Sequence, residues 1–212
     1  MNLAIISDIH GNLPALEKAL SSIKNYKVDN YFFLGDVVNY GPWGDECVEL
    51  IDSIKNSFKI KGNHEEYFIK KKFNGKNILA QKFFNTTISS FKRFDLIKEY
   101  KDEIVIDDIK FIHTLNGKYI FKDTEVDLNC NVVLGHSHQQ FFRKNKNFWV
   151  LNPGSLGQNR KEINRMQYAI LDTKKKEHKF FTEEYNFKKV IEEMVEKNYS
   201  EDCINYYKSK IK

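Results

Sequence analysis

This chain of 212 residues has few of the features that mark secreted or membrane-embedded proteins. Its only cysteines, Cys47, Cys130 and Cys203, lie far apart without C-x-x-C spacing, which argues against a disulfide framework or a zinc knuckle. No apolar run approaches the roughly 18 residues of a membrane span. Asp8 interrupts the apolar start of the chain before a signal-peptide core could form. We therefore expect a reduced, cytoplasmic protein with no membrane partner.

Arginine is also scarce, so the formal net charge of +5 comes mainly from lysine. Clusters such as Lys70-Lys71-Lys72 could attract phosphate-bearing partners, but the 29 acidic residues favour a solvated surface of mixed charge. With only three prolines and ten glycines, no Pro/Gly/Ser-rich linker divides the chain, and no internal repeat is present. The length and the ordinary hydrophobic fraction indicate one globular domain over residues 1–212.

Among the residues that are present, the stretch Ser7-Asp8-Ile9-His10-Gly11-Asn12 stands out. It follows the apolar run 3–6, which is typical of a short buried strand. Asp8 and His10 are two residues apart, so an extended backbone presents both side chains on the same side. A single Asp-x-His pair occurs by chance in many chains and does not by itself indicate a metal site.

Four further apolar runs also end in polar residues of the kinds that bind metal ions. Together, the five runs favour a metal site. They lead into Gly35-Asp36, Gly62-Asn63-His64-Glu65, His113 and Gly135-His136-Ser137-His138. Five of the six histidines lie in these loops, a concentration that ordinary core or surface histidines would not give. Because the ends of neighbouring strands meet in space, the candidate metal ligands are Asp8, His10, Asp36, Asn63, His113, His136 and His138.

Mixed carboxylate, amide and imidazole ligation suits divalent first-row metals such as Mn, Fe, Co, Ni or Zn. Seven ligands are too many for one tetrahedral ion. They suit two ions when one carboxylate bridges the pair and water completes the coordination.

The periodicity predicts an α/β fold. A strand over 3–6, a helix from Leu13 through Ile23 and a strand over 31–34 imply parallel crossovers. A helix over about 45–54 and a strand over 57–61 follow, and 65–98 is helical, forming either core packing or a lid over the site. From residue 103 onward, short alternating runs suggest a second, mixed or antiparallel sheet: 104–106, 109–113, 132–134, 148–151, 168–171 and 179–182. Two amphipathic helices, 187–197 and 201–211, end the chain and either dock on the body or form a dimer contact.

In this order, the five motifs resemble those of the calcineurin-like metallophosphoesterase superfamily. The stretches Ser7–Asn12, Tyr40-Gly41-Pro42 and Asn152–Gln158 resemble its small single-domain phosphodiesterases of bacteria and archaea. The resemblance extends from about Met1 to Asp172, so the closing segment 187–212 is a helical extension outside it. It implies two facing mixed sheets flanked by helices, a four-layer sandwich.

The resemblance also implies roles for particular residues. Asp8, His10, Asp36 and His138 would hold one divalent ion, most simply manganese, and Asp36, Asn63, His113 and His136 would hold the other. Asp36 would bridge them, and a shared hydroxide would attack the phosphate in line. His64 would be the catalytic residue beside the leaving oxygen, either as a proton donor or by stabilising charge.

Three further residues are candidates for substrate binding. Asn12 could contact substrate or simply cap the following helix, Tyr40 lies in the Tyr-Gly-Pro loop, and Arg160 could bind phosphate or form a surface salt bridge.

The chain also departs from the pattern of the family it resembles. Thr114-Leu115-Asn116-Gly117 follows His113 instead of Gly-Ser-Pro, and Asn39 and Tyr40 replace the Asp and Arg of protein phosphatases. We therefore expect the support for His64 to come from elsewhere or to be absent.

The sequence thus predicts a dinuclear-metal phosphoesterase acting on phosphodiesters, and also on monoesters, of small or nucleotide-like compounds. Two alternatives stay open. A catalytically silent scaffold would use the C-terminal helices to bind a partner, and a nuclease would need a continuous basic groove with stacking aromatic residues. A homodimer or higher oligomer is compatible with each of them.

Overall fold

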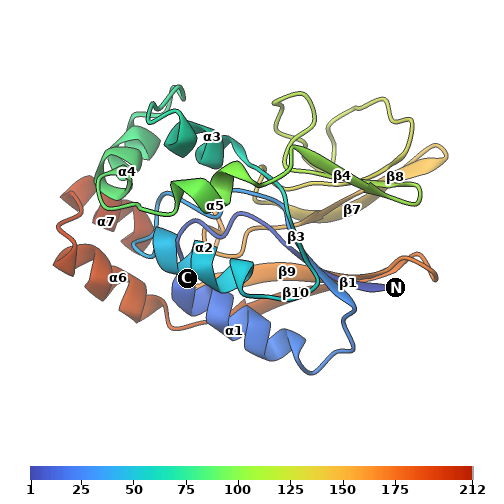
Figure 1. The fold of residues 1–212 in the computed structure, drawn as a ribbon, viewed down its shortest axis with the longest axis horizontal. Coiled ribbons are helices and arrows are strands. Elements are labelled where there is room, and N and C mark those ends of the chain that lie inside the picture. Colours follow the sequence, from blue (N-terminus) through green and yellow to red (C-terminus); the bar gives the residue numbers. More distant parts are fainter. Residues whose placement is uncertain (212) are drawn as a thin grey trace.

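The computed structural model describes residues 1–211 and contains two mixed sheets of five strands each. Strands β1, β2 and β3 of the first sheet run parallel, with β9 antiparallel beside β1 and β10 antiparallel beside β9. The strand order is β10 (Glu177–Glu184), β9 (Arg165–Asp172), β1 (Asn2–Ile6), β2 (Asn30–Phe33) and β3 (Ser57–Lys59). Figure 1 shows the two sheets on one side of the molecule and the helices largely on the other.

The second sheet is built from one continuous part of the chain. Its strands β5, β6 and β8 are parallel, with antiparallel β4 and β7 at its two edges. The order is β4 (Glu103–Ile106), β5 (Ile109–Ile112), β6 (Asn131–Val133), β8 (Phe148–Pro153) and β7 (Gln140–Asn145). The predicted fold class, two mixed sheets flanked by helices, is confirmed.

Two details of the predicted sheets were wrong. The runs 168–171 and 179–182 belong to β9 and β10, which complete the first sheet rather than the second. Alternation identifies a strand but says nothing about a partner 168 residues away, such as Leu3 opposite Leu171. Strand β7 was not predicted, because its sequence QFFRKN is mostly polar.

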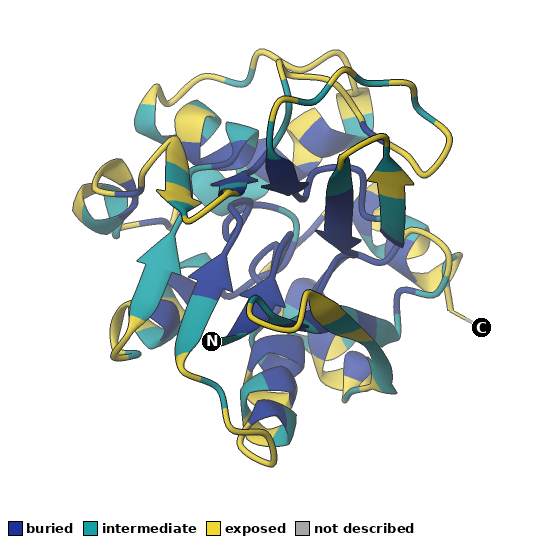
Figure 2. Ribbon diagram, turned by 90° about the vertical axis from the view of Figure 1, so that its right-hand side faces the viewer, coloured by how far each residue is buried: buried dark blue, intermediate teal, exposed yellow. Residues whose placement is uncertain are grey.

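The alternation of β1 and β2 divides the core into two. Leu3, Ile5 and Phe32 face the second sheet, where Phe32 stacks on Phe111 with ring centroids 4.0 Å apart. Ala4, Ile6 and Phe33 face the helices on the other side, as the period of two in a strand requires. Figure 2 shows the buried residues gathered in the strands and inner loops, with exposed residues on the outer loops.

The helices cover the outer face of the first sheet and the end of the molecule where strands β1, β2 and β3 finish. The predicted helical region 65–98 contains three helices, and residues 70–77 and 89–93 separate them. The helix bounds are α1 (Leu13–Ile23), α2 (Gly44–Asp52), α3 (Asn63–Ile69), α4 (Ile78–Ile88), α5 (Phe94–Lys98), α6 (Phe187–Glu196) and α7 (Glu201–Lys208).

The two C-terminal helices dock on the body of the protein. Val190 and Met194 of α6 and Tyr207 of α7 are fully buried in the helical core. Val195 of α6 is 57% exposed, and α7 ends at Lys208, before the predicted helix end at residue 211. Residue 212, the last of the predicted domain and extension, lies outside the described residues.

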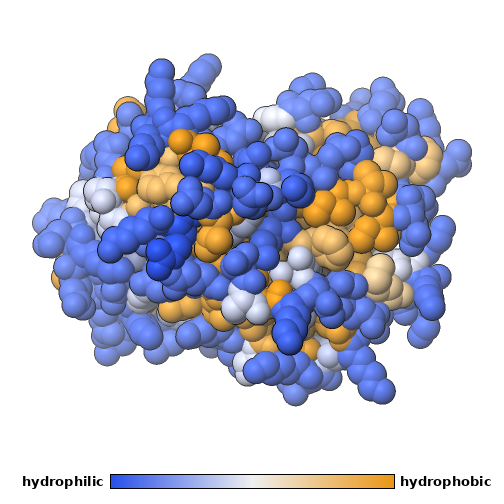
Figure 3. Space-filling view, viewed as in Figure 1, coloured by the Kyte–Doolittle hydropathy of each residue, from blue (hydrophilic) through white to orange (hydrophobic). Residues whose placement is uncertain are grey.

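Hydrophilic residues dominate the face shown in Figure 3, and apolar residues appear there in separate areas. Within residues 1–211, no helix combines the length and apolar character needed to cross a bilayer.

Candidate active site

The predicted ligand residues come together where the parallel strands of both sheets end. Asp8 and His10 follow β1, and His138 follows β6 of the other sheet. The Nε2 atom of His138 lies 3.2 Å from Asp8 Oδ1 and 3.2 Å from His10 Nε2. These three buried side chains form the first cluster, with one donor atom of each within 4.8 Å of the others.

A second cluster lies beside the first and contains Asp36, His113 and His136. His113 Nε2 lies 3.2 Å from Asp36 Oδ2, 3.2 Å from His136 Nδ1 and 3.2 Å from Asn63 Oδ1. Asp36 Oδ2 is also 4.0 Å from His10 Nε2 of the first cluster. Asp36 therefore lies between the two groups, and all seven candidate ligands surround one small region.

Backbone carbonyls fix the orientation of three of the imidazole rings. His113 Nδ1 donates to Leu34 O at 2.7 Å, His138 Nδ1 to Gln158 O at 2.7 Å and His10 Nδ1 to Val38 O at 3.3 Å. A carbonyl only accepts hydrogen bonds, so each ring carries its proton on Nδ1. The Nε2 atoms then point inward, which is the orientation that metal-ligating histidines require.

The backbone around the site is held in an unusual conformation. Asp8, His10, Asp36, His136 and His138 all have φ between 50° and 66°, in the left-handed region. Asp and His are among the few non-glycine residues that adopt it, at a cost of about 1 kcal/mol or more each. The tight turns that result aim successive side chains of one loop at the same point.

The inward-facing atoms of the first cluster are acceptors that lie close together. His10 Nε2 and His138 Nε2 face each other at 3.2 Å, and Asp8 Oδ1 beside them is buried with no hydrogen-bond partner among the described residues. Buried acceptors without a donor are costly. A divalent cation would satisfy all three, so the donor set of each cluster fits a metal ion.

Electrostatics keep most of these groups in the form that binds a cation. Burial raises the pKa of Asp8, but His138 and His113 lower it more, so the pKa lies well below its usual range. Burial lowers the pKa of His136 to about 4. Burial also lowers the pKa of His113, but the adjacent Asp36 outweighs it and raises the pKa to about 10. In the metal-free protein, a proton on His113 therefore takes part of the place of a cation.

Glu65 holds the loop that carries Asp36, a role that the sequence did not reveal although Glu65 belongs to the quoted motif. Its carboxylate accepts hydrogen bonds from the backbone N–H groups of Asp36, Val37 and Gly62, each at 2.7 Å. Gly62 is needed for close approach, because a Cβ there would lie 2.2 Å from Asp36 Oδ1. The Gly-Asn-His-Glu stretch thus positions Asp36 as well as supplying Asn63 and His64.

The support for His64 comes from Asn39, which corrects the expectation that it would lie elsewhere or be absent. Asn39 Nδ2 donates to His64 Nδ1 at 2.8 Å, and Asn39 Oδ1 accepts from the Tyr40 N–H at 2.7 Å. The backbone donor fixes the orientation of the amide, so Nδ1 of His64 is an acceptor. Burial lowers the pKa of His64. The neutral ring therefore carries its proton on Nε2, 4.0 Å from Asp36 Oδ2.

The three candidate substrate-binding residues differ in their surroundings. Asn12 is fully buried, caps α1 through Ala15 N and donates to Gly157 O and the Tyr185 hydroxyl. The amide nitrogen and oxygen of Asn12 therefore both have hydrogen-bond partners within the protein, which favours the capping role. Tyr40 and Arg160 both line a pocket next to His64. No carboxylate in residues 1–211 pairs with Arg160, so the predicted salt-bridge alternative is not found there.

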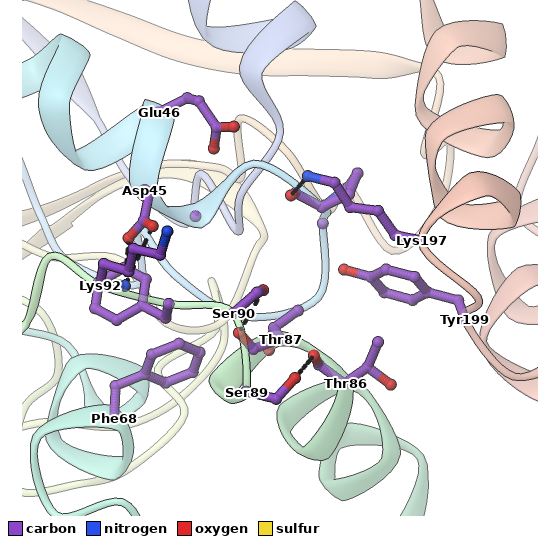
Figure 4. A pocket seen from close by; sticks show the side chains of 14 residues that line it. Asp45, Glu46, Phe68, Thr86, Thr87, Ser89, Ser90, Lys92, Lys197 and Tyr199 are labelled. Carbon is purple, nitrogen blue, oxygen red and sulfur yellow. Dashed lines mark hydrogen bonds between the residues drawn. The ribbon is translucent and has the colours of Figure 1, made fainter.

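A second cavity, of about 330 Å³, is lined in part by Gly41 and Pro42, which follow Asn39 and Tyr40 in the chain. Figure 4 shows this cavity from close by. Its wall includes Thr87, whose hydroxyl lies 3.2 Å from Asn39 Oδ1. The hydroxyls of Thr86, Ser89 and Ser90 donate to backbone carbonyls of α4, and Lys197 donates to Pro42 O. None of the candidate metal ligands lines this cavity. Its Thr87 wall supports Asn39 from the rear.

The family description "Calcineurin-like phosphoesterase superfamily domain" matches residues 1–176. The chain belongs to this family. The match includes both clusters, His64 and Asn39, and it ends before α6 and α7. Membership makes a phosphoric ester hydrolase the expected class of enzyme, with His/Asp clusters that could bind divalent metals.

Two curated proteins of Methanocaldococcus jannaschii are similar over most of their length. The uncharacterized protein MJ0912 is 31% identical, with 91% of each chain covered. Phosphodiesterase MJ0936 is 25% identical, with 84% of this chain and 97% of the relative covered. A crystal structure of a metallophosphoesterase from Sphaerobacter thermophilus shares the fold, with a TM-score of 0.81, 24% identity and coverage of 100% and 99%.

Proposed function

We propose that this protein is a dinuclear-metal phosphoesterase that hydrolyses phosphodiesters, and also monoesters, of small or nucleotide-like compounds. The observation that carries the proposal is the pair of adjacent clusters of buried carboxylate and imidazole donor atoms, with Asp36 between them. Similarity to a phosphodiesterase of Methanocaldococcus jannaschii favours diesters as the first substrates to test.

In this proposal Asp8, His10, Asp36 and His138 hold one ion, and Asp36, Asn63, His113 and His136 hold the other. Carboxylate, amide and imidazole donors favour Mn, Fe, Ni, Co or Zn, with Mn the first choice. When bound, such a pair of ions would lower the pKa of a bound water, which makes hydroxide available near neutral pH. The ions would also neutralise part of the phosphate charge.

The residues of the chain then have distinct tasks. His64 presents an N–H from a neutral ring, so it donates a hydrogen bond to the phosphate or the leaving oxygen. Complete transfer of that proton would leave an imidazolate, which argues for charge stabilisation over proton donation. Arg160, which has no carboxylate partner in residues 1–211, would attract the phosphate. Its guanidinium lies over the Tyr119 ring at 5.5 Å.

The test is hydrolysis of bis-p-nitrophenyl phosphate by protein loaded with manganese, with metal content measured on the same samples. We expect turnover that a chelator abolishes. His64→Ala should retain both ions and lose about 10²–10³-fold in turnover, the range for loss of one hydrogen-bond donor to a developing charge. Asp36→Asn should lose bound metal and activity together, and Asp123→Asn on an exposed loop is the matched control.

Two results would count against the proposal. Asp36→Asn protein that still binds two ions per chain would contradict the bridging role. Fully loaded protein that turns over no phosphodiester or phosphomonoester would favour the silent scaffold.

A further inference from the structure

A pocket of about 310 Å³ opens directly beside His64 and Asn63, and neither the motifs nor the family match assigns it a ligand. Its walls come from parts of the chain that are far apart in sequence. Tyr67 and Phe73 follow the Gly-Asn-His-Glu motif, Tyr119 follows β5, and Tyr206 belongs to α7. Tyr206 lies outside the family match, which ends at residue 176.

Aromatic rings dominate the pocket. The rings of Tyr67 and Phe73 lie edge to face with centroids 5.0 Å apart, and Tyr67 is 5.6 Å from His64. Leu79 and Ala80 add apolar surface at the start of α4. Such a wall binds planar rings through stacking and edge contacts and is sequence-tolerant for nucleic acid bases.

The charge in the pocket is of one sign. Lys76 and Arg160 line it, and no acidic residue does. The first turn of α4 faces it through Leu79 and Ala80, so the positive end of that helix dipole points the same way. Gln158 lines the pocket and is almost fully buried, with its side-chain amide beside the Tyr40 hydroxyl. These features favour a ligand with negative charge and acceptor atoms.

We infer that this pocket binds the leaving group of the substrate, and that the leaving group is a nucleotide. The base would lie against Tyr67 and Phe73, and a further phosphate would contact Lys76 and Arg160. The inference rests on the proposed function, because the position next to His64 makes this the leaving-group side. The volume is at the lower end for ligand pockets, enough for one base-sized group. A quaternary ammonium ligand would be repelled by Lys76 and Arg160, and a lipid chain would contact charged residues at the rim, so both fit the pocket less well.

The hydrolysis balances without a further reactant. A P–O bond forms to a water oxygen, and the P–O bond to the leaving group breaks with its electron pair going to the leaving oxygen. One water proton ends on that oxygen, and the second is lost to solvent as the product phosphate ionises.

Binding to the metal-free protein tests the pocket independently of catalysis. Calorimetry would compare AMP with adenosine, ribose 5-phosphate and inorganic phosphate. We expect AMP to bind about tenfold or more tightly than ribose 5-phosphate, the gain that stacking of one base provides. Equal affinity of these two ligands would overturn the inference.

Variants separate the two parts of the ligand. Tyr67→Leu should weaken AMP and adenosine and leave ribose 5-phosphate unchanged. Lys76→Gln, at an exposed position that tolerates the change, should weaken AMP and ribose 5-phosphate and leave adenosine unchanged. Tyr26→Leu and Lys55→Gln, at positions outside the pocket, are the matched controls, and pocket variants that behave like these controls would overturn the inference.

Hydrolysis of bis-p-nitrophenyl phosphate, measured in parallel, separates the two claims. Turnover without any preference for AMP would overturn the nucleotide pocket and leave the phosphoesterase intact. Tight AMP binding without turnover of any phosphate ester would overturn the phosphoesterase, and with it the leaving-group role.

Discussion

At the scale of single residues, one amide decides what His64 can do. An aspartate at position 39 would accept a hydrogen bond from Nδ1–H and favour an imidazolium, whereas Asn39 donates a hydrogen bond to Nδ1. The ring is then an N–H donor toward the site while it is still neutral. Donation of this kind does not require the ring to be charged, so it should persist at alkaline pH.

Asn39→Asp tests this assignment. The new carboxylate accepts from Nδ1–H, so an Nε2–H donor exists only in the imidazolium. We expect activity of the variant to fall on the alkaline side as the imidazolium loses its proton, while the wild type shows no such loss from this residue. The measurement is the pH dependence of kcat/KM, with ¹⁵N shifts of the His64 ring as a direct readout of the tautomer. Identical alkaline limbs in the two proteins would refute the assignment.

His113 sets a second expectation at this scale, for the pH dependence of metal binding. Its pKa of about 10 in the metal-free protein means that Nε2 carries a proton at pH 7. A cation must displace that proton, so metal affinity should rise by about tenfold per pH unit and level off as the pH approaches 10. Titrations at pH 6, 7 and 8 would measure the slope, and His113→Gln should flatten it. A wild-type affinity that is constant over this range would contradict the expectation.

At the scale of secondary structure elements, strand ends and the short loops after them build the site. Gly62 shows how little room these loops have. In Gly62→Ala, the new Cβ would meet the Asp36 carboxylate and the Asp36 N–H at 2.2 and 2.5 Å. We expect Asp36 to be displaced, with metal content and activity lost although the chain still folds.

Circular dichroism and metal analysis would check the Gly62→Ala expectation, with Gly117→Ala as a control. Gly117 also lies in a loop, but a Cβ there meets nothing within 4 Å. Its positive φ of 69° strains the control, whereas Gly62 has a φ of −95°, so the control carries backbone strain without a clash and Gly62→Ala a clash without that strain. Normal metal binding by Gly62→Ala would show that the loop can move aside.

The elements also show what the sequence could reveal. All five predicted strand ends deliver their polar residues to one place. The sequence could reveal this because each apolar run and the polar residues that end it are adjacent in the chain. The membership of β9 and β10 in the first sheet depends on pairing across most of the chain, and it left no local signal. Asn39 lies three residues after Asp36, but its contact with His64 depends on a turn with positive φ at both Asn39 and Tyr40. Tyr206 gave no sign of its place in the pocket.

At the scale of the whole molecule, the proposed ions join two sheets. Asp8, His10 and Asp36 come from the first sheet, and His113, His136 and His138 come from the second. Ions that bind only the folded protein should stabilise it by about 2.7 kcal/mol per site at a free concentration 100 times Kd. For a chain of this size we expect a Tm increase of roughly 5–10 °C per site.

Scanning calorimetry with and without a chelator would measure the Tm increase. Asp36→Asn should remove most of it, because this carboxylate lies between both clusters. An unchanged Tm in the wild type, with metal bound, would mean that the ions do not join the sheets.

The order of strands in the first sheet has a consequence for how the protein is made. His138, the last candidate ligand, precedes β9, yet β9 is the strand that pairs with β1 behind Asp8 and His10. There is therefore a stage of synthesis at which every candidate ligand is present in the nascent chain but β1 still lacks β9 as a neighbour. Metal uptake should therefore follow the synthesis and pairing of β9 rather than accompany the synthesis of the ligands.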